Sequence, residues 1–350
     1  MSPKFRGNSK NWQSDWLDNT ENTQSLRGPK KGKKPQGFIR LEGDSVPIDQ
    51  ANGIVEEVFP NLCRVIGLDP QQPGVLCSYR RVGVKGGRKD KRERSPVTVG
   101  DRVLFETTGA NSGVVLSICE RRNTLTRPAP GGESNRIHVL AANIEKLVIV
   151  ASAVEPEFTC GLVDRFAVAA QAEGIPVLIC VTKMDLVNAD SDLAWKNYKT
   201  LGFSVVEVSI KRDQGVQDLL EALGKSEAVF CGHSGVGKTS LLQKLLGRPV
   251  GKTGEVNQQT GRGRHTTTSA VRYLGPLLQG WIDTPGVKEF GLADISSQSL
   301  LAFFPEMQGL GCPSPVCIHN GETGCKATHL FRYPSYRRIL QSLLESESNR

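Results

Sequence analysis

A glycine-rich segment in the second half of the chain has the composition and spacing of a phosphate-binding loop. It reads Gly-x-x-x-x-Gly-Lys-Thr, directly after an apolar stretch (AVFC) and directly before a helix-forming one (TSLLQKLL). In that setting the glycines let backbone N–H groups converge on phosphate oxygens, and the helix N-terminus adds the positive end of its dipole. The lysine would bind the β- and γ-phosphates, the threonine hydroxyl would bind Mg²⁺, and both would serve catalysis. The predicted nucleotide-binding residues of this loop are Gly232, His233, Ser234, Gly235, Val236, Gly237, Lys238, Thr239 and Ser240.

A second motif that faces phosphate follows the loop. Asp283-Thr-Pro-Gly286 ends the apolar stretch LLQGWID, where an aspartate could lie near Mg²⁺ and a glycine N–H could sense the γ-phosphate. Between the two motifs lies the polar segment GRGRHTTTSA, which is typical of a switch loop. Its three threonines are equally good candidates for a hydroxyl that binds Mg²⁺: Thr266, Thr267 and Thr268.

A base-reading motif stands upstream of the phosphate loop. Thr182-Lys183-Met184-Asp185 follows the apolar stretch IPVLICV, and the carboxylate of Asp185 could accept the N1–H and N2–H of guanine. Adenine offers no such pair of donors, so this motif predicts guanine specificity. The aliphatic stem of Lys183 would cover the base, and the backbone N–H of Ser209 would meet the guanine O6.

The order of these motifs differs from the usual one. GTPases ordinarily begin with the phosphate loop and end with base recognition, whereas here base recognition comes first and the D-x-x-G motif last. Joining the old termini and cutting after D-x-x-G produces this order without changing any strand pairing. Val- and Ile-rich runs alternate with helical patterns through the same region, which favours a mainly parallel sheet covered on both faces. The expected fold is a circularly permuted G domain of the α/β class.

The position that normally carries a catalytic glutamine is aliphatic. Val287 follows Gly286, and its side chain cannot orient an attacking water. We therefore expect slow turnover in isolation and a partner that completes the catalytic arrangement. His265, in the switch segment, is the best replacement for the glutamine; the alternative is an ordinary surface histidine.

Four residues near the C-terminus have the spacing of a metal site. Cys312-x₄-Cys317-x-His319-x₅-Cys325 offers three thiolates and one imidazole, a donor set that suits tetrahedral Zn²⁺. Four protein ligands leave no open position, so the expected role is structural, with one zinc per chain. His329 is an alternative to His319 as the fourth ligand. The four residues could also be reduced cysteines beside an incidental histidine, with no metal site.

The N-terminal third has a different texture. Short β-like runs separated by turn residues begin near residue 51 and predict an OB-type barrel. Residues 85–94 form a basic insertion within it, and residues 1–45 are polar and without periodicity. The expected organisation is a disordered basic tail (1–45), the barrel (46–120), a connector (121–145), the permuted GTPase domain (146–295) and a zinc-binding helical domain (296–350).

Charge and hydropathy limit the kinds of partner. The 350 residues carry a net charge of +8, and residues 1–40 alone hold nine Lys/Arg against three Asp/Glu. Such imbalance favours a polyanion such as RNA, although a solvated tail would look the same. No apolar run reaches the roughly 18 residues of a membrane span, and the N-terminus lacks a secretory signal. We expect a cytoplasmic monomer that does not bind membranes.

Taken together, these motifs resemble the RsgA (YjeQ) family, circularly permuted GTPases of ribosome biogenesis. The resemblance rests on GHSGVGKT, GRGRHTTT, DTPG, the preceding RNTLTRP and AANIEKLVIV, and the Cys/His cluster, and it covers about residues 50–340. It implies binding to the 30S subunit and its 16S rRNA, stimulation of GTP hydrolysis to GDP by that subunit, and a role in its late maturation. Thr182 stands where the family commonly has Asn, which removes an amide that braces the phosphate loop and predicts lower affinity.

Two other classes of function compete with this interpretation. In a P-loop ATPase or kinase the TKMD sequence would be incidental, and ATP would bind as well as GTP. In an RNA-binding scaffold the nucleotide site would be vestigial, which the intact Lys238, Thr239 and Asp283 argue against.

Overall fold

A computed structural model describes most of the chain from residue 46 onward. The described residues are 46–68, 74–79, 97–128, 137–189, 191, 193–250, 270–284, 290–292, 295–314 and 316–348. Several predicted features therefore lie outside the described residues: the tail 1–45, the basic insertion 85–94, His265, Thr266, Thr267, Thr268, Gly286 and Val287.

The N-terminal strands close into a barrel. Their order is β1-β2-β3-β5-β4, and a pairing between β1 and β4 closes the ring. β3 and β5 run parallel while the other neighbours run antiparallel, which is a five-stranded barrel of the predicted OB type. Alternate side chains point inward and form a separate small core, which includes Val55, Cys63, Val65 and Val103. The strands are β1 (Gly53–Phe59), β2 (Leu62–Gly67), β3 (Val75–Ser78), β4 (Arg102–Gly109) and β5 (Ser112–Ile118).

The predicted connector holds two strands of its own. β6 (Thr124–Pro128) and β7 (Ile137–Ala142) pair antiparallel as an isolated two-stranded sheet. The hairpin is joined to the end of the helix α2 (Cys160–Ala172) through Glu173, whose carboxylate accepts a hydrogen bond from the Thr124 N–H at 3.0 Å. These runs are too short and too irregular in polarity to identify as strands before their neighbours are known.

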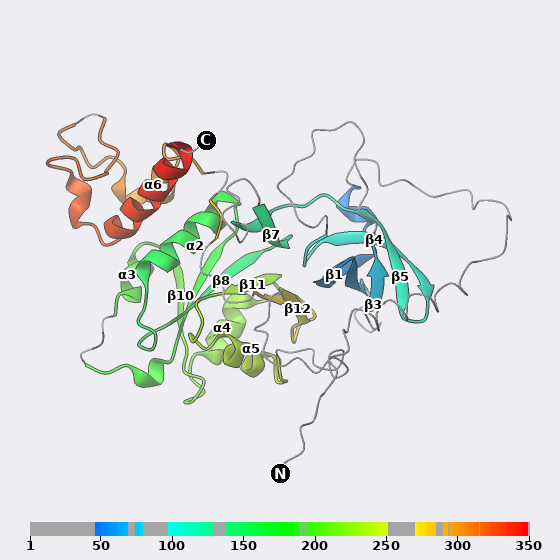
Figure 1. The fold of residues 1–350 in the computed structure, drawn as a ribbon. Helices are drawn as coiled ribbons and strands as arrows, with labels where there is room; N and C mark the ends of the chain where they lie inside the picture. The colour runs from blue at the N-terminus through cyan, green and yellow to red at the C-terminus, as the bar shows by residue number, and fades with distance from the viewer. Residues whose placement is uncertain are drawn as a thin grey trace, which may run out of the picture. The chain divides into compact units, whose positions relative to one another are not determined.

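The following residues form a mainly parallel sheet with helices on both faces (Figure 1). Its strand order is β10-β9-β8-β11-β13-β12, parallel from β10 to β13, with β12 antiparallel at the end. One face packs against α2 and α3, and the other packs against α4 and α5, so two hydrophobic cores flank the sheet. The strands are β8 (Lys146–Ser152), β9 (Val177–Thr182), β10 (Ser204–Glu207), β11 (Ala228–Cys231), β12 (Val271–Leu274) and β13 (Gly280–Asp283). The helices are α2 (Cys160–Ala172), α3 (Trp195–Thr200), α4 (Val216–Leu223) and α5 (Lys238–Leu246).

The barrel and this sheet are hydrogen-bonded to each other. Glu57 of β1 pairs with Val271 of β12, which in turn pairs with Asp283 of β13. The eleven strands thus form one continuous sheet, and the barrel is joined to the strands that bear the D-x-x-G aspartate.

The C-terminal elements pack on α2. The long helix α6 (Tyr333–Ser348) lies beside α2, and both contribute to one hydrophobic core, with Phe166 on α2 and Tyr336 and Leu340 on α6 (Figure 1). Asp164 and Arg332 form a buried ion pair at 2.7 Å between the two regions. The short 3₁₀ turns are η2 (Ile48–Gln50), η3 (Met184–Leu186), η4 (Leu300–Phe303), η5 (Pro305–Met307) and η6 (Lys326–His329).

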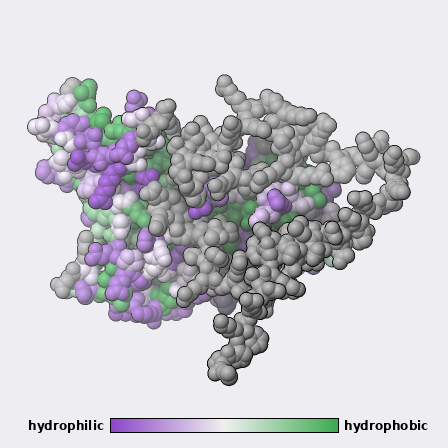
Figure 2. Space-filling view, viewed as in Figure 1, coloured by the Kyte–Doolittle hydropathy of each residue, from purple (hydrophilic) through white to green (hydrophobic). Residues whose placement is uncertain are grey.

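The surface of the described residues is mostly polar over these last elements. In the space-filling view, hydrophilic residues dominate the C-terminal region at the upper left, with hydrophobic residues in small separate areas (Figure 2). Within the described part of the chain, no helix combines the length and the apolar character that crossing a bilayer requires.

Candidate nucleotide site and metal centre

The phosphate loop connects β11 to α5, as its spacing predicts. Gly235 and Gly237 adopt positive φ angles of 86° and 88°, a region that side chains disfavour. A Cβ on Gly232 would lie 2.2 Å from the Val150 carbonyl oxygen, so the loop can follow this path only with glycine there. The N-terminus of α5 begins at Lys238, which places Thr239 and Ser240, both exposed, in its first turn.

Lys238 joins the phosphate loop to the D-x-x-G motif. Its Nζ lies 2.6 Å from Asp283 Oδ1 and also donates to the Thr284 carbonyl. The lysine is nearly buried, so this pairing neutralises a charge that would otherwise be poorly solvated. The two motifs predicted to flank the triphosphate therefore lie in direct contact.

The base-reading motif lies at the end of β9, beside the phosphate loop. Thr182 is buried, and its hydroxyl donates to the Val236 carbonyl at 2.5 Å, a contact between residues 54 positions apart. Lys183 then takes a left-handed conformation, φ 59°, and turns the chain into η3, where Asp185 stands. The Thr182 hydroxyl thus braces the phosphate loop, so replacing the family's commoner asparagine does not leave the loop unbraced.

Asp185 is held in place as a carboxylate. The buried Ser209 hydroxyl donates to its Oδ1 at 2.9 Å, and the Lys211 ammonium lies 3.5 Å from its Oδ2. The Ser209 hydrogen bond keeps the pKa of Asp185 below its ordinary value, and the Lys211 charge acts in the same direction. Since a carboxylate accepts but does not donate, this environment preserves the form that could accept both guanine donors.

The structure gives Ser209 a different part from the one expected. Its backbone N–H donates to the Gln214 carbonyl at 3.0 Å, and its side chain orients Asp185. Its N–H is therefore engaged within the protein, and the predicted contact of this N–H with the guanine O6 stays a prediction. The sequence carried no signal for this local turn.

The four predicted metal ligands come together. The three Sγ atoms and one imidazole nitrogen of Cys312, Cys317, His319 and Cys325 all lie within 4.8 Å of one another. His319 Nδ1 lies 3.7, 3.4 and 3.2 Å from the Sγ atoms of Cys312, Cys317 and Cys325. A tetrahedral ion with standard Zn–S and Zn–N bonds requires sulfur–nitrogen separations of about 3.6 Å, so the cluster has the dimensions to hold one.

A second layer of contacts orients the ligands. His319 Nε2 lies 3.1 Å from the Met307 carbonyl, which leaves Nδ1 free of its proton and facing the sulfurs. The Lys326 backbone N–H donates to Cys312 Sγ at 3.4 Å and lowers the pKa of that thiol. His329, the alternative ligand, is exposed on η6 and is not among the four clustered residues.

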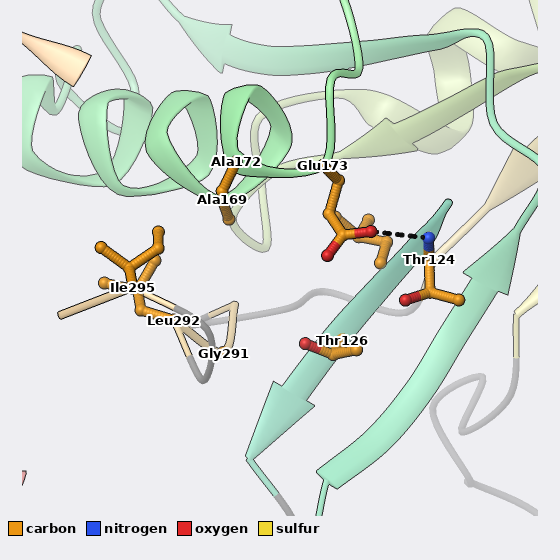
Figure 3. A pocket seen from close by; sticks show the side chains of 9 residues that line it. Thr124, Thr126, Ala169, Ala172, Glu173, Gly291, Leu292 and Ile295 are labelled. Carbon is orange, nitrogen blue, oxygen red and sulfur yellow. Dashed lines mark hydrogen bonds between the residues drawn. The ribbon is translucent and has the colours of Figure 1, made fainter. Parts of the chain in front are cut away.

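A pocket elsewhere on the sheet has a different character. It is lined by residues at the end of α2, by β6 and by Gly291, Leu292 and Ile295 (Figure 3). The carboxylate of Glu173 at its edge is engaged by Thr124 (Figure 3). Beside this pocket the Gly291 N–H donates to the Thr126 carbonyl at 2.9 Å, and this hydrogen bond fixes Gly291, downstream of the D-x-x-G motif, to β6.

The sequence is similar to one family of known proteins. A family model described as RsgA GTPase matches residues 118–293. A protein of Azotobacter vinelandii named "Small ribosomal subunit biogenesis GTPase RsgA" is 34% identical over 93% of this chain and 96% of its own length. One of Chlorobaculum parvum with the same name is 36% identical over 71% of this chain and 86% of its own.

Solved structures show the same architecture. The crystal structure of YjeQ from Thermotoga maritima superposes with a TM-score of 0.60 at 25% identity, over 84% of this chain and 98% of the other. That of YloQ, described as a circularly permuted GTPase, gives 0.56 at 24% identity, over 84% of this chain and 94% of the other. The motif order is therefore a true permutation of a P-loop GTPase fold, and the chain belongs to the RsgA GTPase family.

Proposed function

We propose that this GTPase binds the 30S ribosomal subunit through 16S rRNA, assists its late maturation and hydrolyses GTP to GDP and phosphate when the subunit stimulates it. The observation that supports the proposal best is the Thr182–Val236 hydrogen bond, which joins the end of β9, three residues before Asp185, to the phosphate loop in spite of the inverted motif order. The names of the relatives, small ribosomal subunit biogenesis GTPases, supply the partner. We place the protein in the cytoplasm as a monomer, with the domain boundaries predicted above.

In this proposal each motif has a defined part. Asp185 selects guanine, and the stem of Lys183 covers the base. Lys238 leaves Asp283 and the Thr284 carbonyl to bind the β- and γ-phosphates, which offer it more negative charge. Thr239 and Asp283 would hold Mg²⁺, which supplies charge neutralisation on the phosphates when bound. Gly286 would sense the γ-phosphate and His265 would orient the water; both lie outside the described residues.

We expect GTP turnover to rise at least about tenfold when purified 30S subunits are added, because Val287 cannot orient water and a partner must complete the site. The measurement is phosphate release with the protein alone, with 30S and with 50S subunits. Equal rates in all three would contradict the proposed partner. A His265→Ala variant that keeps the full stimulated rate would remove His265 from the mechanism.

We also propose that the C-terminal cluster holds one structural zinc. Replacing Cys317 with serine should remove the metal, because only three of the four ligands remain and a neutral serine hydroxyl is a poor substitute for a thiolate. Elemental analysis of the purified protein should give about one zinc per chain, and less than about a tenth of that in the variant. The Cys160→Ser variant, at a half-buried cysteine outside the cluster, is the matched control, and folded wild-type protein without zinc would contradict the assignment.

A further inference from the structure

The loop between β8 and α2 contacts both halves of the nucleotide site. Residues 153–159 leave β8 beside β9, and the Ala153 N–H donates to the Thr182 carbonyl at 2.9 Å. The Glu155 carbonyl accepts a hydrogen bond from the Lys183 ammonium. On the other side, Pro156 Cδ lies 3.8 Å from the place that a Cβ on Gly235 would occupy, so the loop also touches the phosphate loop.

Ser152, the last residue of β8, holds the loop of residues 153–159 by a hydrogen bond. Its hydroxyl donates to the Pro156 carbonyl at 2.5 Å, and its side chain is 2% exposed, so water competes little for the bond. Ser152 stands directly opposite Thr182 in the β8–β9 pairing. Two neighbouring hydroxyls therefore hold two different loops: that of Thr182 holds the phosphate loop, and that of Ser152 holds the loop bearing Glu155.

We infer that Ser152 is a positioning residue for nucleotide binding, acting through the Glu155 carbonyl on the ammonium of Lys183. A free lysine side chain loses rotamer entropy when it becomes ordered. Anchoring the ammonium before the nucleotide arrives removes part of that loss and leaves the aliphatic stem extended along the base site. This inference rests on the proposed function, since it assigns Lys183 to the base.

The Lys183 stem should therefore contribute to the affinity for a purine nucleotide without distinguishing guanine from adenine. The stem of a lysine packs on any purine, whereas Asp185 distinguishes the hydrogen-bonding edge. Loss of the Ser152 hydroxyl should therefore weaken GDP and GTP equally, raise KM and leave kcat unchanged, the signature of uniform binding.

The test is a double-mutant cycle on the whole protein, with dissociation constants for GDP and a non-hydrolysable GTP analogue measured by calorimetry. Ser152→Ala is expected to weaken both by about threefold to tenfold, and Ser152→Thr, which keeps the hydroxyl, should restore them. Lys183→Met keeps an apolar stem but cannot donate, so it should weaken binding by a similar factor. Ser152→Ala should then add little in the Lys183→Met background.

Wild-type affinity in Ser152→Ala, or full additivity in the double variant, would overturn the inference. If Ser152→Ala lowers the melting temperature, Lys183→Met decides, because its half-buried side chain lies outside the core and unchanged affinity there removes the role of the ammonium. The outcomes stay separate from the proposed function: a wild type without guanine preference defeats that proposal, whereas a guanine-selective wild type with a silent Ser152→Ala defeats only this one.

Discussion

Replacing Asp185 with asparagine is expected to weaken the binding of GTP and GDP by about 100-fold or more. The variant loses two charge-assisted hydrogen bonds from the N1–H and N2–H of guanine. The NH₂ group of its amide also faces one of these N–H groups, and two donors cannot form a hydrogen bond. The Ser209 hydroxyl and the Lys211 ammonium, which hold the wild-type carboxylate, would remain in place. Calorimetric titration with GDP measures the loss directly.

The same variant should gain affinity for xanthosine nucleotides. Xanthine has a carbonyl where guanine has its 2-amino group, and an asparagine amide can donate to that carbonyl. Asp213→Asn is the matched control, because the Asp213 carboxylate is exposed and pairs with Lys244, whereas Asp185 is held by Ser209 and Lys211. An Asp185→Asn protein that binds GDP as the wild type does would contradict the assignment of Asp185 to the base.

Removing Asp164 is expected to destabilise the fold by about 3–5 kcal/mol, because it leaves the charge of Arg332 buried without its principal partner. The side chains are 0% and 1% exposed, and the Tyr198 hydroxyl donates to the same carboxylate oxygen at 3.0 Å. Burial raises the pKa of Asp164, while the Arg332 guanidinium opposes that rise. The measurement is urea denaturation of Asp164→Ala against the wild type.

Two further variants identify the cause of that loss. The exposed ion pair between Lys199 and Glu207 is the control, and Lys199→Ala should cost only about 0–1 kcal/mol. Replacing both partners, as Asp164→Leu with Arg332→Met, should recover most of the stability, since no unpaired charge remains. A double variant as unstable as Asp164→Ala would show that the carboxylate acts by packing and not by charge.

The buried ion pair also bears on how the C-terminal region communicates. Arg332 precedes α6 and contacts Glu306 and the ring of Phe304, while Asp164 lies on α2 beside the nucleotide-binding sheet. The C-terminal region that carries the Cys/His cluster is thus fixed to α2 by the Arg332–Asp164 ion pair as well as by a shared hydrophobic core. We expect movements of α2 and α6 to be coupled.

The chemistry of the phosphate loop was predictable because its spacing is set by backbone geometry. Gly235 and Gly237 have positive φ angles, and Lys238 begins a helix. Both features follow from the residue types of a short, contiguous motif. The metal cluster was predictable for the same reason, since Cys312, Cys317, His319 and Cys325 lie within fourteen positions and the ligand types are chemically restricted. The barrel strands followed from short β-like runs separated by turn residues.

Contacts between distant segments were not predictable in this way. The Thr182–Val236 hydrogen bond and the Asp164–Arg332 pair join residues 54 and 168 positions apart, and nothing in the local pattern selects those partners. The hydrogen bond from the Ser209 N–H to the Gln214 carbonyl depends on the conformation of the turn between them. The β6–β7 hairpin depends on packing against its neighbours. The hydrogen bond from Ser152 to the Pro156 carbonyl likewise depends on the path of the loop after β8, which the sequence pattern does not indicate.

The most direct test is titration of the wild-type protein with GDP and with ADP in the same calorimeter. If the carboxylate of Asp185, which precedes the phosphate loop in the sequence, binds the guanine base, GDP should bind at least about 100-fold more tightly than ADP. Equal affinities for the two nucleotides would contradict the assignment of residues 182–185 to the base, and with it the mechanism proposed for this chain.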